Sequence, residues 1–219
     1  MENLYFYGKS ATIAGMHTLQ EIRRGLDNLI TSARNDIQPI IQLENPEGGY
    51  FGVPRAIFSY VDYLGALYCG YNSERDRNGV RRISTSRKAE HFITEIMSQI
   101  DPVYGETGRL LYRMYRRGTV HLYRPNALRR QDGRMIAWIS YKGPRDGFVS
   151  DGNIVDVQAR HCMPVRWTDT EDRLPVSINC LYDDLLASIE RYYGMIGNEI
   201  NSGHISVLQQ NFSNVVDAL

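Results

Sequence analysis

Apolar residues recur at three- and four-residue spacing in most of this chain, which is the pattern of helices that bury one face. The spacing predicts five helices, and the tail from 204 to 219 adds a candidate for a sixth. Their expected ranges are 18–41, 54–71, 84–100, 102–118 and 177–196. Helices therefore dominate the expected fold.

The first two helices carry further signals. Thr18 suits the N-cap of the first helix, and Glu21 stands three places on as its capping-box partner. The second helix contains small residues, among them Gly65 and Ala66, which would let another helix approach closely. Asp62 lies in the middle of this apolar helix, so we expect its carboxylate to pair with an arginine of the later basic helix.

After residue 118 the pattern changes to alternation with period two, which is typical of strands. Short strands are expected at 119–123, 134–141 and 154–157. The fold predicted from these patterns is a mainly α protein: a helical bundle of five to six helices with a small antiparallel β insertion at about 119–157. We expect residues 16–219 to form one domain, whereas residues 1–15 resemble a tag or a disordered leader.

Composition narrows the class of protein. A hydrophobic fraction of 42% and a charged fraction of 23% are ordinary for a globular protein, and the formal net charge is zero. Zero net charge argues against a role in coating DNA. No stretch is apolar for long enough to span a membrane, and we expect a cytoplasmic protein without a membrane partner.

Charge is distributed unevenly despite the zero sum. Residues 101–145 contain ten Lys or Arg against three Asp or Glu, whereas residues 146–201 contain four against ten. The two segments would dock on each other, or the basic segment would face an anionic partner. In the first case, Asp183, Asp184 and Glu190 are candidate partners for the arginines.

The cysteines and histidines outside the basic helix do not form a recognisable metal site. Cys69, Cys162 and Cys180 include no C-x-x-C pair, which disfavours both a disulfide framework and a zinc ribbon. His161 and Cys162 with Cys180 and His204 would be a zinc set only at irregular spacing. His91 is expected on a surface helix without a partner. We therefore expect neither a metal nor another cofactor.

The stretch 102–125 brings several reactive residue types together. Its helix has an apolar side and a basic side, formed by Arg109, Arg113, Arg116 and Arg117. The helix is expected to end near Gly118, which places His121 just beyond it. Imidazole exchanges protons near neutral pH, and guanidinium binds phosphate oxygens through a planar fork.

Arg116 and His121, separated by four residues at the end of a helix, resemble the R-x4-6-H motif of the HEPN superfamily. Members of that family are helical, often dimeric, and many are metal-independent ribonucleases of toxin–antitoxin and phage-defence systems. The resemblance implies that His121 is the general acid/base and that Arg116 holds the scissile phosphate. Arg113, Arg117 and Asp62 would support them, with RNA or a nucleotide as ligand and a homodimer as the assembly.

Two other functions stay open at this point. The helical face would bind a protein partner or a second copy, as in a non-catalytic scaffold, or the arginines would bind a nucleotide without cleaving it, as in a sensor. His121 would also be explained as a structural residue that donates a hydrogen bond to a backbone carbonyl.

Overall fold

The computed structural model describes residues 17–42, 49–69, 85–122, 124–150 and 156–196, with 209, 211 and 212. Of residues 85, 117–122 and 196 it describes the backbone alone. Within these ranges the helices are α1 (Leu19–Ile41), α2 (Gly52–Cys69), α3 (Thr85–Glu95), η1 (Met97–Gln99), α4 (Val103–Leu122) and α5 (Ile178–Ile196). The strands are β1 (Leu128–Arg129), β2 (Met135–Tyr141), β3 (Asp146–Val149), β4 (Val157–Arg160), β5 (Val165–Arg166) and β6 (Glu171–Ser177).

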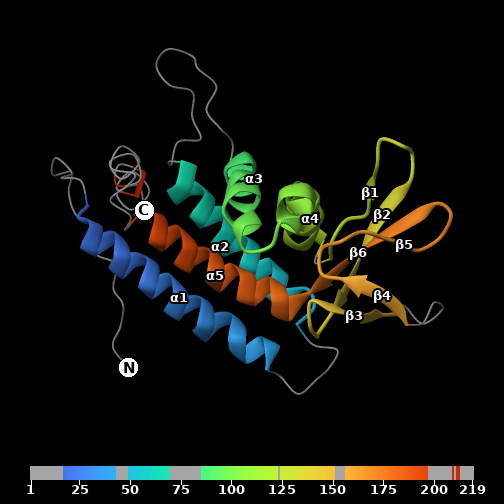
Figure 1. Cartoon of the computed structure of the whole chain (residues 1–219), viewed down its shortest axis with the longest axis horizontal. Coiled ribbons are helices and arrows are strands. Elements are labelled where there is room, and N and C mark those ends of the chain that lie inside the picture. Colours follow the sequence, from blue (N-terminus) through green and yellow to red (C-terminus); the bar gives the residue numbers. More distant parts are fainter. Residues whose placement is uncertain are drawn as a thin grey trace, which may run out of the picture.

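The helices gather at one end of the long axis and the strands at the other (Figure 1). Of the described residues, 60% are helical and 18% are in strands, and the helices do not form a clear bundle. The predicted fold class, a helical bundle with a small antiparallel insertion, is therefore wrong. The chain has an α+β architecture in which helices and strands are segregated.

The start of α1 confirms the capping prediction. The Thr18 hydroxyl accepts the Glu21 backbone N–H, and the Glu21 carboxylate accepts the Thr18 backbone N–H. Ile22, Leu26 and Ile37 are buried along one face of the helix, as their spacing predicted. Pro39 lies inside the last turn of α1 and does not end it.

α2 approaches α3 very closely at Gly65. A Cβ atom added at Gly65 would lie 2.6 Å from the backbone nitrogen of Ala89 and 2.6 Å from the carbonyl carbon of Lys88. Real Cβ atoms do not come so near to backbone, and a helix backbone cannot rotate away as a side chain can. The prediction that small residues of this helix permit close packing is confirmed at this position.

Gly65→Ala is therefore expected to destabilise the protein by about 1–3 kcal/mol through overpacking, measured by urea unfolding. Gly194→Ala is the matched control, because Gly194 also lies in a helix but has no neighbour within 4 Å of the added Cβ. That change should be neutral or stabilise by up to about 1 kcal/mol. Equal unfolding midpoints for Gly65→Ala and wild type would contradict the close contact.

α4 extends beyond the end that the sequence predicted. It continues through Gly118 to Leu122, so residues 119–122 are helical and no strand forms there. A single glycine inside a helix costs only about 1 kcal/mol, and Gly118 does not end this one. At the other end, the Asp101 carboxylate accepts the Val103 N–H at 3.0 Å and satisfies one free donor of the first turn.

The main sheet has four strands in the order β1-β2-β6-β5. Its central pair, β2 and β6, is parallel over seven residues, from Met135 opposite Glu171 to Tyr141 opposite Ser177. The outer pairs are antiparallel, and β3 and β4 form a separate antiparallel pair. The predicted strand at 134–141 is confirmed as β2, but the strand region runs from 128 to 177 and not from 119 to 157.

The strands pack in two layers. Ile136, Leu174 and Val176 belong to the same buried cluster as the helices. Ile139 and Tyr141, which alternate with Ile136 along β2, pack instead on a smaller cluster of Val149, Ala159 and Trp167. The β3–β4 pair thus covers the face of the sheet that is turned away from the helices. The helical layer, the sheet and this pair form three successive layers.

Candidate functional site

Arg116 is held by the carboxylate predicted to pair with the basic helix. Its Nε donates to Asp62 Oδ2 at 2.6 Å, and the Tyr112 hydroxyl donates to Asp62 Oδ1 at 2.5 Å. The Asp62 side chain is 14% exposed and that of Arg116 33% exposed. The interaction confirms the expected partner of Asp62, and it links α4 to α2.

Arg116 and His121 do not flank a helix end as predicted. Both lie within α4, and five positions on a continuous helix differ by about 140° around its axis. The two positions therefore lie on different sides of the helix. The side chains of Arg117 and His121 lie outside the described part of the structure. Arg113 is exposed.

A hollow between α3 and α4 brings together a different set of groups. It has a volume of about 360 Å³ and is lined by Arg87, Glu90 and His91 of α3 and by Arg109 of α4. We call it the α3–α4 hollow. The three α3 residues share one face because Glu90 and His91 follow Arg87 by three and four residues along the helix. The hollow thus combines two guanidinium groups, an imidazole and a carboxylate.

The imidazole of His91 is oriented by a carboxylate. Its Nδ1 lies 3.1 Å from Glu95 Oε1, and the Tyr68 hydroxyl donates to Glu95 Oε2 at 2.6 Å. The Tyr68 hydroxyl and His91 lower the pKa of Glu95 despite an opposing effect of burial. A charged Glu95 accepts the proton on Nδ1 and leaves Nε2 to exchange protons. The expectation that His91 has no partner is wrong, and the i,i+4 spacing of His91 and Glu95 was the signal for it.

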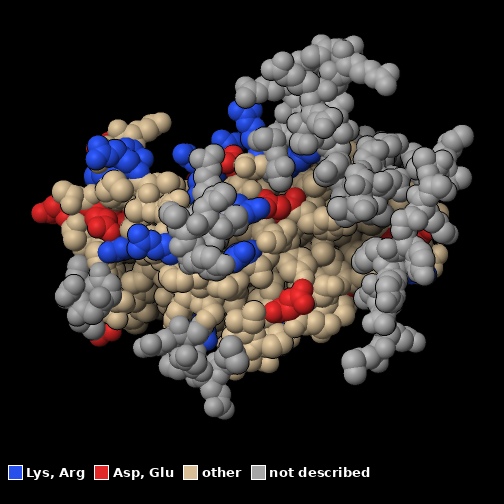
Figure 2. Space-filling view, turned by 180° about the vertical axis from the view of Figure 1, so that it is seen from behind, with Lys and Arg blue, Asp and Glu red and all other residues tan. Residues whose placement is uncertain are grey.

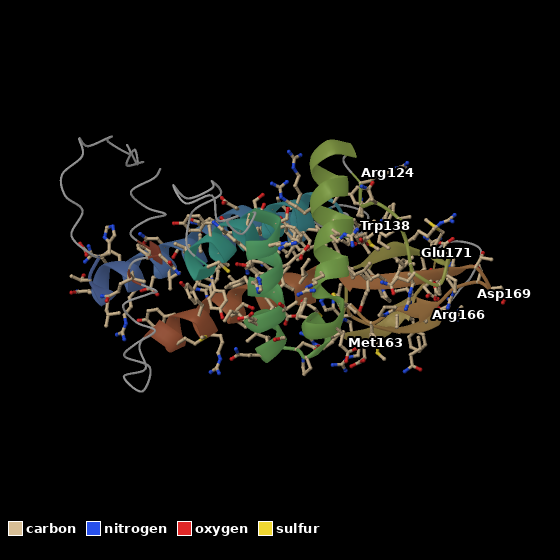
Figure 3. All side chains as sticks on the ribbon, turned by 90° about the horizontal axis from the view of Figure 1, so that it is seen from above. Arg124, Trp138, Met163, Arg166, Asp169 and Glu171 are labelled. Atoms are coloured by element: carbon tan, nitrogen blue, oxygen red, sulfur yellow. The ribbon has the colours of Figure 1, made fainter. Side chains whose placement is uncertain are left out.

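Basic side chains continue from the hollow along α4. Arg109, Arg113 and Arg116 follow one another at spacings of four and three, so they lie on neighbouring turns of the same side. α3 and α4 run side by side across the molecule when it is seen from above (Figure 3).

On the rear face, Lys and Arg side chains are scattered over the upper half and are interrupted by Asp and Glu (Figure 2).

A second polar group of residues is buried where α4, α5 and the strands meet. The Tyr104 hydroxyl donates to Asp184 Oδ2 at 2.7 Å and lies 2.9 Å from His161 Nε2. Arg145 donates from one guanidinium nitrogen to Asp184 and from the other to Asp101, each at 2.6 Å. We call these five residues the Tyr104 network. His161 and Tyr104 are 0% exposed, so no substrate reaches these two side chains, and we interpret the network as structural.

This network also shows how the basic and acidic segments dock. Arg145 belongs to the basic segment and Asp184 to the acidic one, so this ion pair is a contact between the two segments, which was one of the two alternatives left open by the sequence. The arginine is not one of those predicted, because Arg145 follows β2 and precedes β3, and only the fold brings it to α5. Asp183, the neighbour of Asp184, is exposed.

The ring of His161 is fully used by protein groups. Its Nδ1 accepts the Ser177 backbone N–H at 3.0 Å, which assigns the ring proton to Nε2 and lets Nε2 donate to Tyr104. The alternative zinc set is therefore not supported at His161, since no lone pair is left for a metal. Among the described residues, no group of three metal-binding side chains occurs. His204 lies outside the described residues.

The buried His161 makes stability depend on pH. Burial, reinforced by Arg145, lowers the pKa of His161 to about 3, whereas the unfolded value is about 6.5. Above about pH 6.5 the imidazole of His161 is neutral in both the folded and the unfolded state. As the pH falls from about 6.5 towards 3, only the unfolded chain gains this proton, so the free energy of unfolding drops by about 1.4 kcal/mol per pH unit.

Between pH 7 and pH 5 this residue should cost the wild type about 2 kcal/mol of stability, and His161→Gln should remove that part of the pH dependence. Urea unfolding at both values of pH measures the difference. Parallel pH profiles for the two proteins would contradict a neutral, buried His161.

The three cysteines are free, and two of them are buried. Cys162 lies beside His161, with its Sγ 3.2 Å from Nε2, but it is 0% exposed. Burial raises the pKa of the Cys162 thiol well above its usual value. A thiol that is both protonated and inaccessible is not a nucleophile, so this His–Cys pair is not a candidate active site.

In the described part of the chain, no helix combines the length and apolar character needed to cross a membrane. Comparisons of the chain with models of protein families, with curated proteins and with solved structures gave no match, so the site is defined by its own geometry.

Proposed function

We propose that the α3–α4 hollow binds the phosphate backbone of RNA and cleaves it by metal-independent transesterification. In this proposal Arg87 and Arg109 hold the phosphate, while His91 and Glu90 transfer the protons. The observation that supports it most is the convergence of these four groups in one hollow, with the His91 ring oriented by Glu95.

The four groups match what the reaction requires. The RNA 2′-hydroxyl loses its proton and attacks the adjacent phosphorus, the bond from phosphorus to the 5′-oxygen breaks, and that oxygen receives a proton. The products are a 2′,3′-cyclic phosphate and a 5′-hydroxyl. One proton-transfer group must accept and the other donate, roles open to the Glu90 carboxylate and His91 Nε2. The guanidinium groups stabilise the charge that develops on the phosphate oxygens.

This proposal keeps the activity implied by the HEPN resemblance and assigns it to other residues. Arg116 is already paired with Asp62. Its position and that of His121 lie on different sides of α4. A homodimer remains a prediction of the resemblance, and light scattering after size-exclusion chromatography tests it.

Incubating the purified protein with mixed-sequence RNA in EDTA tests the proposed function. We expect cleavage products that end in 2′,3′-cyclic phosphate, and we expect DNA of the same sequence to stay intact because it lacks the 2′-hydroxyl. Cleavage of both nucleic acids, or RNA products with 5′-phosphates, would contradict the mechanism. Binding of RNA without cleavage would favour the sensor, and neither binding nor cleavage would favour the scaffold.

A further inference from the structure

Three arginines converge on one buried carboxylate at the far end of the main sheet. Asp172, at the start of β6, is 4% exposed. Arg130 Nη1 donates to its Oδ2 at 3.0 Å, Arg166 Nε lies 3.2 Å from its Oδ1, and Arg134 Nη2 donates to Oδ1 as well. We call these four residues the Asp172 cluster. They lie at the strand end of the molecule, where Figure 3 labels Arg166.

The strands hold the cluster in a fixed arrangement. Arg166 of β5 is the direct partner of Asp172 in the antiparallel β5–β6 pair. Arg130 and Arg134 flank the turn that precedes β2, and the Arg130 N–H donates to the Arg134 carbonyl at 2.8 Å. Two separate segments, the β1–β2 turn and β5, thus supply the three guanidinium groups. Arg166 lies within β5, whereas Arg130 directly follows β1 and Arg134 directly precedes β2, so strands anchor all three positions.

The cluster has more positive charge and more donors than Asp172 can satisfy. Three guanidinium groups contact Asp172. One further carboxylate, that of Asp132, lies 4.0 Å from Arg130. Among the described residues that pair with the cluster, this leaves one positive charge in excess, and each guanidinium has five N–H donors. The side chains of Arg130 and Arg166 are 44% and 61% exposed, so part of their donors face solvent.

One donor of the cluster is buried and lacks an acceptor. Arg134 Nε has no hydrogen-bond partner within the described residues. A buried donor without a partner is costly, so Asp172 does not satisfy all the hydrogen-bond donors of the arginines that surround it. This observation is independent of the exposed donors of Arg130 and Arg166.

We propose that the Asp172 cluster binds a phosphate group, free or as a monoester. Arg130 and Arg166 supply the contacts to its oxygens, and Asp172 holds the two guanidinium groups beside each other before the ligand arrives. Phosphate suits this site because its several oxygens accept the planar forks of more than one arginine, and its negative charge matches the excess. The site shares no residue with the α3–α4 hollow and does not depend on the proposed function.

Isothermal titration calorimetry with inorganic phosphate, at constant ionic strength, tests this site. We expect saturable binding of one phosphate per chain and a loss of affinity of about tenfold or more in Arg166→Ala. Arg166 is the most exposed arginine of the cluster, so this variant should fold. Arg129→Ala is the matched control, because Arg129 is exposed on β1 and has no contact with Asp172 among those described.

Phenyl phosphate in the same titration distinguishes a free anion from a monoester. Equal or tighter binding than inorganic phosphate assigns the site to monoesters, and much weaker binding assigns it to the free anion. Absence of saturable binding would overturn the proposal. Equal affinities of Arg166→Ala and wild type, or an equal loss in Arg129→Ala, would overturn it too.

Discussion

His91→Ala is expected to lower the rate of RNA cleavage by about 10²–10⁴-fold, the usual contribution of one general acid/base group. The reason is that the ring of His91 lines the α3–α4 hollow and is fixed by Glu95, so its Nε2 is placed to exchange a proton with the substrate. Single-turnover cleavage of a short RNA measures the effect on the chemical step.

Two comparisons make this result specific. His121→Ala should leave the rate close to that of wild type if the hollow is the site, whereas the HEPN resemblance requires the opposite. Glu95→Gln should slow cleavage less than His91→Ala, because the amide oxygen still accepts the proton on Nδ1 but carries no charge. A full loss of cleavage in His121→Ala with normal cleavage in His91→Ala would refute the assignment to α3 and α4.

Asp184→Ala is expected to lower the free energy of unfolding by about 3–5 kcal/mol, the cost of breaking a buried ion pair by removing one partner. The change removes the acceptor of both the Tyr104 hydroxyl and one nitrogen of Arg145. Tyr104 is 0% exposed, so water does not replace the lost acceptor without a rearrangement of the core. Urea unfolding measures the difference.

The next residue along α5 provides the control for this prediction. Asp183→Ala removes an identical side chain from the exposed side of the helix, and we expect it to change stability by less than about 0.5 kcal/mol. Asp184→Asn should fall between the two alanine variants, because it keeps one acceptor oxygen and loses the charge. Equal effects of Asp183→Ala and Asp184→Ala would show that the Tyr104 network does not stabilise the fold.

Local patterns in the sequence predicted the helical part of the fold well. The apolar spacing located α1, α2 and α5, and the capping pair of Thr18 and Glu21 forms as expected. The same local reasoning failed at the end of α4, where Gly118 suggested a stop. One glycine lowers helix stability only slightly, and it does not outweigh the packing of the residues before it.

The strands were harder to predict because their pairing is not local. β6 pairs with β2, about 36 residues earlier in the chain, and the parallel register leaves no turn signal between them. The sequence interpretation placed the end of the strand region at 157 and missed β6. It also missed the excess of arginine at the sheet end, because Arg130 and Arg134 are about 40 residues from Asp172 in sequence and reach it only through the pairing of β2 with β6.

The candidate site also combines contacts that local sequence patterns predict with contacts that depend on the packing of distant segments. His91 and Glu95 are one helical turn apart, so their interaction was open to prediction from spacing alone. That Arg109 of α4 faces them depends on how α4 packs against α3, which no local pattern reports. The interaction of Asp62 with Arg116 was predicted because a charge inside an apolar helix requires a partner.

The sequence by itself determined where the main helices form, which of their faces are buried, and that Asp62 needs a positive partner. These properties depend on neighbours within a few turns of the chain. Only the tertiary structure decided the parallel core of the sheet, the burial of His161 and the meeting of Arg109 with His91. Each of these depends on contacts between segments far apart in the chain, whose partners are selected by the packing of the whole molecule.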